Sequence, residues 1–252
     1  MIKKVVVSAA GQGTRMLELT KEKSKHLIKV NNRPFLSYLL DNILEAGYRE
    51  IILVVGFRED MIREFIKNYK PFTNSIELVN GRDYKINIVN QFDILGPKEK
   101  EYGTACPIKC VKEFTGNESF ISLVGDNFYS VEDLKSMNID DEYNYVAGLQ
   151  NDHPEKFGVL LVEGEMLKEI IEKPKKFVGN LINTSLYKFT PEIFEVVFKI
   201  GKSLRGEYEI TEALSLLAKN KKVKVKIIKD NWMDFGTPSD VEKFSKLLKS
   251  EK

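Results

Sequence analysis

The residues best suited to chemistry lie directly after the first apolar run of the chain. Residues 8–15 read Ser-Ala-Ala-Gly-Gln-Gly-Thr-Arg, and Ser24-Lys25 follows soon afterwards. Small residues let the backbone approach a ligand, and successive N–H groups in such a turn form an anion-binding nest. The guanidinium of Arg15 can hold a phosphate through two hydrogen bonds. The segment therefore predicts a triphosphate cradle formed by Ala9, Ala10, Gly11, Gly13, Thr14 and Arg15.

Three other interpretations apply to the same glycines. A dinucleotide-binding fingerprint requires a third glycine where this chain has Met16. A P-loop ends in Gly-Lys-Ser/Thr, which this segment lacks. An ordinary tight turn between a strand and a helix would explain a lone Gly-x-Gly, but Thr14-Arg15 and Ser24-Lys25 favour phosphate binding.

One aspartate stands where an α/β sheet binds ligands, and a second lies in a turn. Asp126 follows the apolar run 120–124, and Asp234 lies in a Trp-x-Asp-x-Gly turn. Ligands of such sheets bind beyond the carboxyl ends of the strands. A carboxylate buried there without a partner is costly, and a Mg²⁺ ion that bridges to phosphate would compensate it. Asp126 is therefore a predicted Mg²⁺ ligand, with a helix N-cap or a turn aspartate as the alternative, and Asp234 has the same two interpretations.

Lys173 and Gln91 are two further candidates. Lys173 precedes Pro174, and proline restricts the backbone of the residue before it. This suits a lysine held toward a phosphate, and a solvated lysine in a charged run is the alternative. Gln91 has one donor and one acceptor end, which can pair with the edge of a pyrimidine, and a surface amide is the alternative.

Composition limits the class of protein. The 252 residues suit one large α/β domain, and a formal net charge of +2 argues against a nucleic-acid partner. No apolar run approaches the ~18 residues that cross a bilayer or the ~7–15 of an export signal, so we expect no membrane partner and a cytoplasmic location. Cys106 and Cys110 are interpreted as reduced, packed thiols, and His26 and His153 as polar loop residues.

The elements that must position these residues alternate between strand and helix in the first half of the chain. Strands are predicted over residues 3–8, 51–55, 76–79, 86–89 and 120–124, and helices over 34–46, 61–69 and 104–114. Alternation of this kind builds a mostly parallel sheet flanked by helices. Later strands are predicted over 146–149, 159–162, 168–171, 181–189 and 223–228, with helices over 191–199, 210–219 and 237–248. This change of pattern predicts a second lobe on the same sheet, which would form the other wall of a cleft.

The order of these motifs resembles the sugar nucleotidyltransferase family, whose common members are glucose-1-phosphate thymidylyl- and uridylyltransferases. The N-terminal signature is Ala10-Gly11-Gln12-Gly13-Thr14-Arg15, with Ser24-Lys25-His26-Leu27 and Arg33-Pro34. Later blocks follow in order: Gln91, Tyr102-Gly103-Thr104-Ala105, Gly125-Asp126-Asn127, Phe157-Gly158-Val159, Glu172-Lys173-Pro174, Asn183-Thr184-Ser185-Leu186-Tyr187, Gly206-Glu207, and residues 232–237. Two departures stand out: residues 92–101 are longer and more charged than the usual link, and Ser185 replaces a frequent glycine.

The resemblance implies a Rossmann-like α/β fold with a sugar-binding lobe on the same sheet, in one domain over residues 1–252. Residues 1–130 would form the nucleotide-binding half and residues 131–252 the sugar-binding half. The implied reaction joins a nucleoside triphosphate, UTP or dTTP, to a sugar 1-phosphate such as glucose 1-phosphate, and releases pyrophosphate. Gln91, Gly103 and Thr104 would contact the nucleotide. The sugar phosphate would contact Gly158, Glu172, Lys173, Asn183 and Thr184.

Such a reaction depends on positioning and charge neutralisation, because a dianion attacks a polyanion. Arg15 and Lys25 would bind the triphosphate, Lys173 the incoming phosphate, and Asp126 with Asp234 the Mg²⁺ ion. The alternatives are a cytidylyltransferase for a small phosphorylated alcohol, an inactive regulatory member of the fold, and an NAD-dependent dehydrogenase. The sequence leaves open the sugar, the choice between UTP and dTTP, the role of residues 92–101, and whether the chain forms a homo-oligomer.

Overall fold

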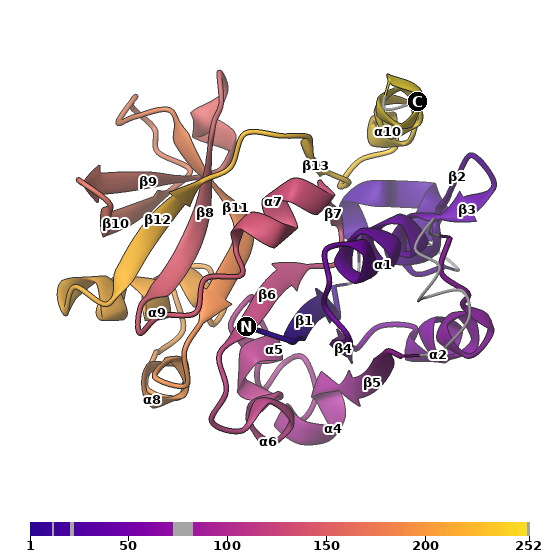
Figure 1. Ribbon diagram of the computed structural model, residues 1–252, viewed down its shortest axis with the longest axis horizontal. Coiled ribbons are helices and arrows are strands. Elements are labelled where there is room, and N and C mark those ends of the chain that lie inside the picture. The colour runs from indigo at the N-terminus through magenta and orange to yellow at the C-terminus, as the bar shows by residue number, and fades with distance from the viewer. Residues whose placement is uncertain (12, 21–22, 73–82, 251–252) are drawn as a thin grey trace.

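One mixed sheet of nine strands runs through the molecule (Figure 1). The computed structural model describes residues 1–11, 13–20, 23–72 and 83–250. The strand order is β5-β4-β1-β6-β11-β8-β12-β10-β9. Their bounds are β1 Lys4–Ala9, β4 Glu50–Val55, β5 Lys85–Asn90, β6 Phe120–Val124, β8 Asn144–Gln150, β9 Gly158–Glu163, β10 Met166–Glu172, β11 Leu181–Phe189 and β12 Val223–Ile227.

The expected Rossmann-like α/β sheet is confirmed, and its parallel part lies in the first half of the chain. β5, β4, β1 and β6 are parallel neighbours, and β11 joins β6 antiparallel. From β11 onward the pairings are mixed, with β12 parallel to β8 and β9 antiparallel to β10. The carboxyl ends of β1 and β6 therefore lie at one edge of the sheet, and there the N–H of Gly125 donates to the carbonyl of Ser8 at 2.8 Å.

Helices cover both faces of the sheet because its buried strands carry apolar side chains on both sides. Successive side chains of a strand point to opposite faces. Val6 of β1 thus joins the core under α8 and α9, whereas Val5 and Val7 join the core under α1 and α7. The helix bounds are α1 Phe35–Glu45, α2 Glu59–Asn68, α4 Gln91–Leu95, α5 Cys106–Lys109, α6 Lys112–Thr115, α7 Val131–Ser136, α8 Ile193–Val197, α9 Ile210–Lys219 and α10 Ser239–Ser250. Within the described ranges, no helix is long and apolar enough to cross a membrane.

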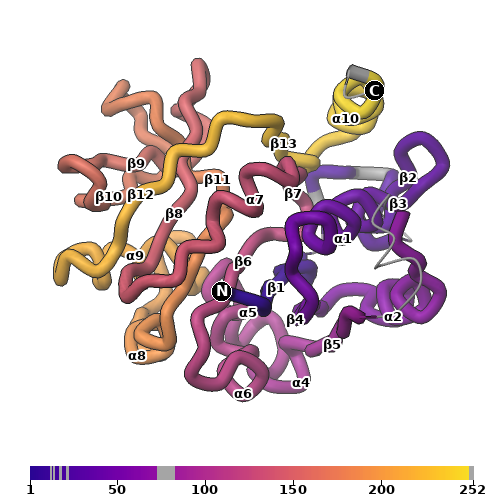
Figure 2. The backbone as a smooth tube through the Cα atoms, in the orientation of Figure 1, coloured from indigo at the N-terminus to yellow at the C-terminus, as the bar shows by residue number. Residues whose placement is uncertain are grey.

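The end of the chain returns to the N-terminal half. Figure 2 traces it from β12 through β13 (Trp232–Asp234) to α10, which lies beside the hairpin of β2 (Lys29–Val30) and β3 (Arg33–Pro34). A separate aromatic core holds it: Phe235 stacks on Phe35 with ring centroids 4.2 Å apart, and Phe244 of α10 lies 5.0 Å from Phe35. β13 also pairs antiparallel with β7 (Asn127–Tyr129). This return brings Asp234 to the edge of the sheet that carries Asp126.

Most predicted elements are confirmed, but the helix predicted over residues 104–114 is wrong. The structure has two short helices there, α5 and α6, separated near Val111. Contacts with a distant segment fix the start of this region, because Ala105 donates to the carbonyl of Tyr208 at 2.9 Å. The charged stretch 92–101 begins in a helix that was not predicted, α4. The strand predicted over residues 76–79 lies outside the described residues.

Candidate active site

Two adjoining cavities lie along the edge formed by the carboxyl ends of β1 and β6. The loop cavity, of about 470 Å³, is lined by Ala10, Gly11, Lys25, Gln91 and Gly103 among others. The lobe cavity, of about 280 Å³, is lined by Gly158, Glu172, Asn183, Tyr187 and Asp234 among others. Residues that line both cavities include Ser8, Arg15, Thr104, Asp126, Lys173 and Arg205. The structure thus gathers charged residues of both signs at the junction of the two cavities.

The glycine loop shapes the position of Lys25. Gly13 has φ 68°, and its carbonyl accepts from the N–H of Met16 at 2.9 Å and from the hydroxyl of Thr20 at 3.0 Å. A Cβ at Gly13 would lie 3.0 Å from Cβ of Lys25, so only glycine leaves room for the lysine beside the loop. Ala9 is fully buried in β1 and lines neither cavity. Gln12 and the side chain of Thr14 lie outside what the structure describes.

Lys25 forms an ion pair with Asp126 at the junction. The two side chains are 12% and 17% exposed, and the ammonium donates to the Asp126 carboxylate. Burial by itself would raise the pKa of Asp126, but the charge of Lys25, together with hydrogen bonds to the carboxylate and the neighbouring His26, lowers the pKa overall. Asp126 is therefore ionised, and Lys25 is its counter-charge.

Asp234 is held near Asp126 by the two-stranded sheet. Asp234 pairs with Asn127 in the register of β13 and β7, and the N–H of Phe235 donates to the carbonyl of Asp126 at 2.8 Å. Burial, and then the charge of Asp126, raise the pKa of Asp234 to about 6, although Arg15 approaches it at 3.9 Å. A pair of neighbouring carboxylates in which the charge of Asp126 raises the pKa of Asp234 suits a divalent cation, since the ion would relieve their repulsion. Within the described ranges no group of three or more Asp, Glu, His or Cys side chains could hold a metal ion.

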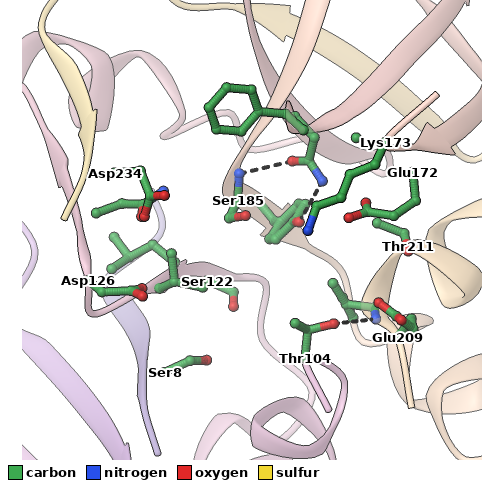
Figure 3. Close-up of a pocket in the computed structure, with 18 of the residues that line it drawn as sticks. Ser8, Thr104, Ser122, Asp126, Glu172, Lys173, Ser185, Glu209, Thr211 and Asp234 are labelled. Carbon is green, nitrogen blue, oxygen red and sulfur yellow. Dashed lines mark hydrogen bonds between the residues drawn. The ribbon is translucent and has the colours of Figure 1, made fainter. Parts of the chain in front are cut away.

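The lobe cavity presents Glu172 and Lys173 opposite the two aspartates (Figure 3). Lys173 has φ 43°, in the left-handed region, and not the extended backbone that is usual before proline. Its N–H donates to the carbonyl of Phe157 at 3.0 Å, which fixes this turn. A Cβ at Gly158 would lie 3.1 Å from Oε2 of Glu172, so glycine there lets the carboxylate pack against β9. Burial raises the pKa of Glu172.

Thr184 is one predicted contact that the structure does not bring to either cavity. It is fully buried, and its hydroxyl donates to the carbonyl of Ala147 at 2.9 Å. Its own carbonyl accepts from the hydroxyl of Tyr129 at 2.8 Å and from Nε1 of Trp232 at 3.3 Å. Thr184 thus ties β11 to the strands that carry the aspartates, and its effect on a ligand would be indirect.

Three residues that were predicted to contact the nucleotide line the loop cavity, and the structure shows what surrounds each of them. Gln91 is 2% exposed at the start of α4, and its Oε1 has no hydrogen-bond partner among the described residues. Gly103 has φ 137°, and a Cβ there would lie 2.3 Å from the carbonyl oxygen of Tyr208. Thr104 is exposed, and its Oγ1 accepts from the N–H of Ile210 at 2.9 Å. Gly103 and Thr104 therefore join the loop cavity to the segment that precedes α9.

Sequence reasoning missed Arg205 and misjudged His26. Arg205 approaches Glu172 at 3.8 Å and Glu209 at 3.5 Å. The only sequence feature that could have pointed to Arg205 is its place directly before the Gly206-Glu207 motif. His26 is not a polar loop residue, since it is 1% exposed and contacts Oγ of Ser24 at 3.0 Å. Burial lowers its pKa to about 3, so the ring is neutral.

Comparison with known proteins identifies the family. The model of the family described as "Nucleotidyl transferase" matches residues 4–251. The UTP–glucose-1-phosphate uridylyltransferase AglF of Haloferax volcanii is 29% identical over 98% of this chain and 96% of that protein. The low-salt glycan biosynthesis nucleotidyltransferase Agl11 of the same organism is 30% identical over 99% of this chain and 67% of that protein.

Solved structures agree in fold. A crystal structure of UDP-glucose pyrophosphorylase complexed with UDP-glucose has a TM-score of 0.82 and 24% identity, with all of both chains covered. A second structure of UDP-glucose pyrophosphorylase, without ligand, has a TM-score of 0.80 and 23% identity. At this level of identity the likeness shows the fold, whereas the family model spans nearly all of the sequence. The chain belongs to the nucleotidyl transferase family, which confirms the resemblance drawn from its motifs.

Proposed function

We propose that the protein joins a nucleoside triphosphate, UTP or dTTP, to a sugar 1-phosphate, with glucose 1-phosphate as the first candidate, and releases pyrophosphate. The observation that carries this proposal is the shared wall of the two cavities, where Arg15, Asp126, Lys173 and Arg205 line both. Two anionic substrates could meet only where their charges are compensated. The name of AglF as a UTP–glucose-1-phosphate uridylyltransferase supports the same pair of substrates.

The triphosphate would occupy the loop cavity. Gly11, Arg15 and Lys25 line it, and the glycine-rich backbone beside them can approach phosphate oxygens closely. The sugar 1-phosphate would occupy the lobe cavity beside Glu172 and Lys173. In this proposal, residues 1–130 serve as the nucleotide-binding half and residues 131–252 as the sugar-binding half of one domain.

The buried amide of Gln91 supports a uracil or thymine base. Its Oε1 lacks a partner among the described residues, and a buried acceptor without a donor is costly. Uracil and thymine both present an N–H between two carbonyls, so this N–H could donate to Oε1 while the amide nitrogen donates to a carbonyl. Cytosine has an acceptor at the same ring position, so it could not donate from there to Oε1.

Asp126 and Asp234 are the residues that would hold a Mg²⁺ ion. Their carboxylates suit its preference for oxygen ligands, and substrate phosphates would complete the coordination. When bound, the ion would neutralise developing negative charge on the phosphates. Lys25 pairs with Asp126, so the lysine and the ion would share this carboxylate beside the triphosphate.

The chain's own residues would act by position and charge. The sugar phosphate is mostly a dianion at neutral pH, since the second pKa of such phosphates is about 6, so it needs no general base. Lys173 would hold it with one oxygen in line with the α-phosphorus of the triphosphate. That oxygen forms the new P–O bond as the bond to pyrophosphate breaks, and Arg15 and Lys25 would stabilise the charge on the leaving group.

Pyrophosphate release tests this proposal directly. The purified protein would be assayed with Mg²⁺ over a panel of UTP, dTTP, CTP, ATP and GTP against several hexose 1-phosphates. We expect turnover with UTP or dTTP, and loss of it in Asp126→Asn and Asp234→Asn. Absence of pyrophosphate with every pair would refute the proposal, and turnover of CTP with a phosphorylated alcohol would favour the cytidylyltransferase alternative.

A further inference from the structure

Ser185 occupies a left-handed backbone position inside a strand that lines the lobe cavity. Its φ is 59°, and it lies where the pairing of β11 with β8 shifts register between Asn183 and Tyr187. L-residues are disfavoured in this region because Cβ crowds the following carbonyl oxygen, whereas glycine is free of that clash. The chain therefore places a side chain where glycine would adopt the backbone more easily.

Local hydrogen bonds hold this irregularity in place (Figure 3). Oδ1 of Asn183 accepts from the N–H of Ser185 at 2.9 Å, and Nδ2 of Asn183 donates to the hydroxyl of Tyr187 at 2.9 Å. A register shift of this kind re-aims the side chain at the shift. Figure 3 places Ser185 between Asp234 and Lys173, among the residues that line the cavity.

Most other non-glycine residues with positive φ in the described chain have a turn or cap to explain them. Asn31 and Asn32 join β2 to β3, Arg58 precedes α2, and Lys221 follows α9. Lys173 and Ser185 instead line the lobe cavity. Strained residues persist where the surroundings hold them and are concentrated at ligand sites. The strain at Ser185 is thus associated with the cavity and not with a chain reversal.

We propose that Ser185 determines sugar specificity by hydrogen-bonding one ring hydroxyl of the sugar 1-phosphate through its Oγ. This inference rests on the proposed function and names a residue for the sugar side of that site. A hydroxyl can donate and accept, so it can serve any equatorial or axial hydroxyl within reach. A site that bonds a substrate hydroxyl discriminates against the analogue that lacks it. Sugars deoxygenated at that one position would therefore be poor substrates.

Two variants separate the hydroxyl from the backbone. Ser185→Ala removes Oγ and keeps the left-handed cost, whereas Ser185→Gly removes both. We expect Ser185→Gly to raise Tm by about 2–4 °C and Ser185→Ala to leave it unchanged or lower. Both variants should lose about 3- to 10-fold in kcat/KM for glucose 1-phosphate, the effect of one neutral hydrogen bond, with the KM for the triphosphate unchanged. For the monodeoxy glucose 1-phosphate that lacks the contacted hydroxyl, variant and wild type should have equal kcat/KM. For the other monodeoxy analogues the variants should keep their loss.

The outcomes of this experiment distinguish the two proposals. Wild-type protein that releases no pyrophosphate with any triphosphate and hexose 1-phosphate overturns the proposed function, and this inference with it. If the wild type is active and both variants stay within twofold of it on every sugar, only the role of Ser185 is overturned. A uniform loss across glucose 1-phosphate and all its monodeoxy analogues also overturns it, because a structural effect would not select one hydroxyl.

Discussion

Replacing Lys25 by methionine should destabilise the ligand-free protein because it leaves Asp126 without its counter-charge. The two side chains are 12% and 17% exposed, so the pair is largely buried. Breaking a buried pair by removing one partner costs about 3–5 kcal/mol, and we expect about 3 kcal/mol here because the adjoining cavity admits water. At roughly 2–4 °C per kcal/mol for a chain of this size, Tm should fall by about 6–12 °C.

Thermal unfolding in metal-free buffer measures this effect, with Lys246→Met as the matched control. Lys246 pairs with Glu242 on the surface of α10, where the side chains are 73% and 75% exposed. Such surface pairs contribute little, so the control should shift Tm by less than about 2 °C. The double variant Lys25→Met with Asp126→Asn should recover most of the loss, because it no longer buries an unpaired charge.

Added Mg²⁺ distinguishes the proposed role of the pair from a purely structural one. If the cation and the lysine ammonium compensate the same carboxylate, Mg²⁺ should raise the Tm of Lys25→Met more than that of the wild type. Turnover should nevertheless fall at least ~10²-fold, the scale of one preorganised charge contact in the transition state. A Lys25→Met protein with wild-type Tm in metal-free buffer would refute the argument that the ion pair stabilises the fold. A loss of turnover below tenfold would refute the proposed role of Lys25 in the reaction.

Three other results would test the site. In calorimetric titrations, Mg²⁺ affinity should fall as pH drops below about 6, the raised pKa of Asp234, because the ion must then displace a proton. Asp234→Asn should bind Mg²⁺ weakly and without that pH dependence. Gln91→Leu should lower kcat/KM for UTP about tenfold and reduce the preference for UTP over CTP. Its Tm should be unchanged or raised, because the substitution removes an unpaired buried acceptor. Gly103→Ala should lower the free energy of unfolding by about 3 kcal/mol in urea titrations, because its Cβ would meet the carbonyl oxygen of Tyr208 at 2.3 Å.

Site residues that directly follow a predicted strand in the sequence could be placed in advance. The glycine loop follows β1 and Asp126 follows β6, and the two strands are parallel neighbours, so their carboxyl ends meet at one edge. Apolar runs of the right length marked both strands. The family resemblance added Asp234, which no local pattern would place near Asp126, because the pairing of β13 with β7 joins residues about a hundred positions apart.

What could not be predicted depends on contacts between distant segments. The pairing of Lys25 with Asp126 spans 101 positions, and no propensity reports it. The helix predicted over residues 104–114 starts only at Cys106, because the N–H of Ala105 binds the distant carbonyl of Tyr208. Thr184 looked like a ligand contact in its motif, but tertiary packing directs its hydroxyl to Ala147. In each case a partner remote in sequence overrides a local signal.

Three of the cations that line the two cavities lie beside carboxylates. Lys25 pairs with Asp126, Arg15 approaches Asp234, and Arg205 approaches Glu172. A phosphate that entered alone would have to compete with these carboxylates for the same cations. A divalent ion that took over Asp126 and Asp234 would release Lys25 and Arg15 at the place where the phosphates arrive. Metal and triphosphate would then favour each other's binding, because the ion would neutralise the two carboxylates and leave Lys25 and Arg15 to neutralise the phosphates.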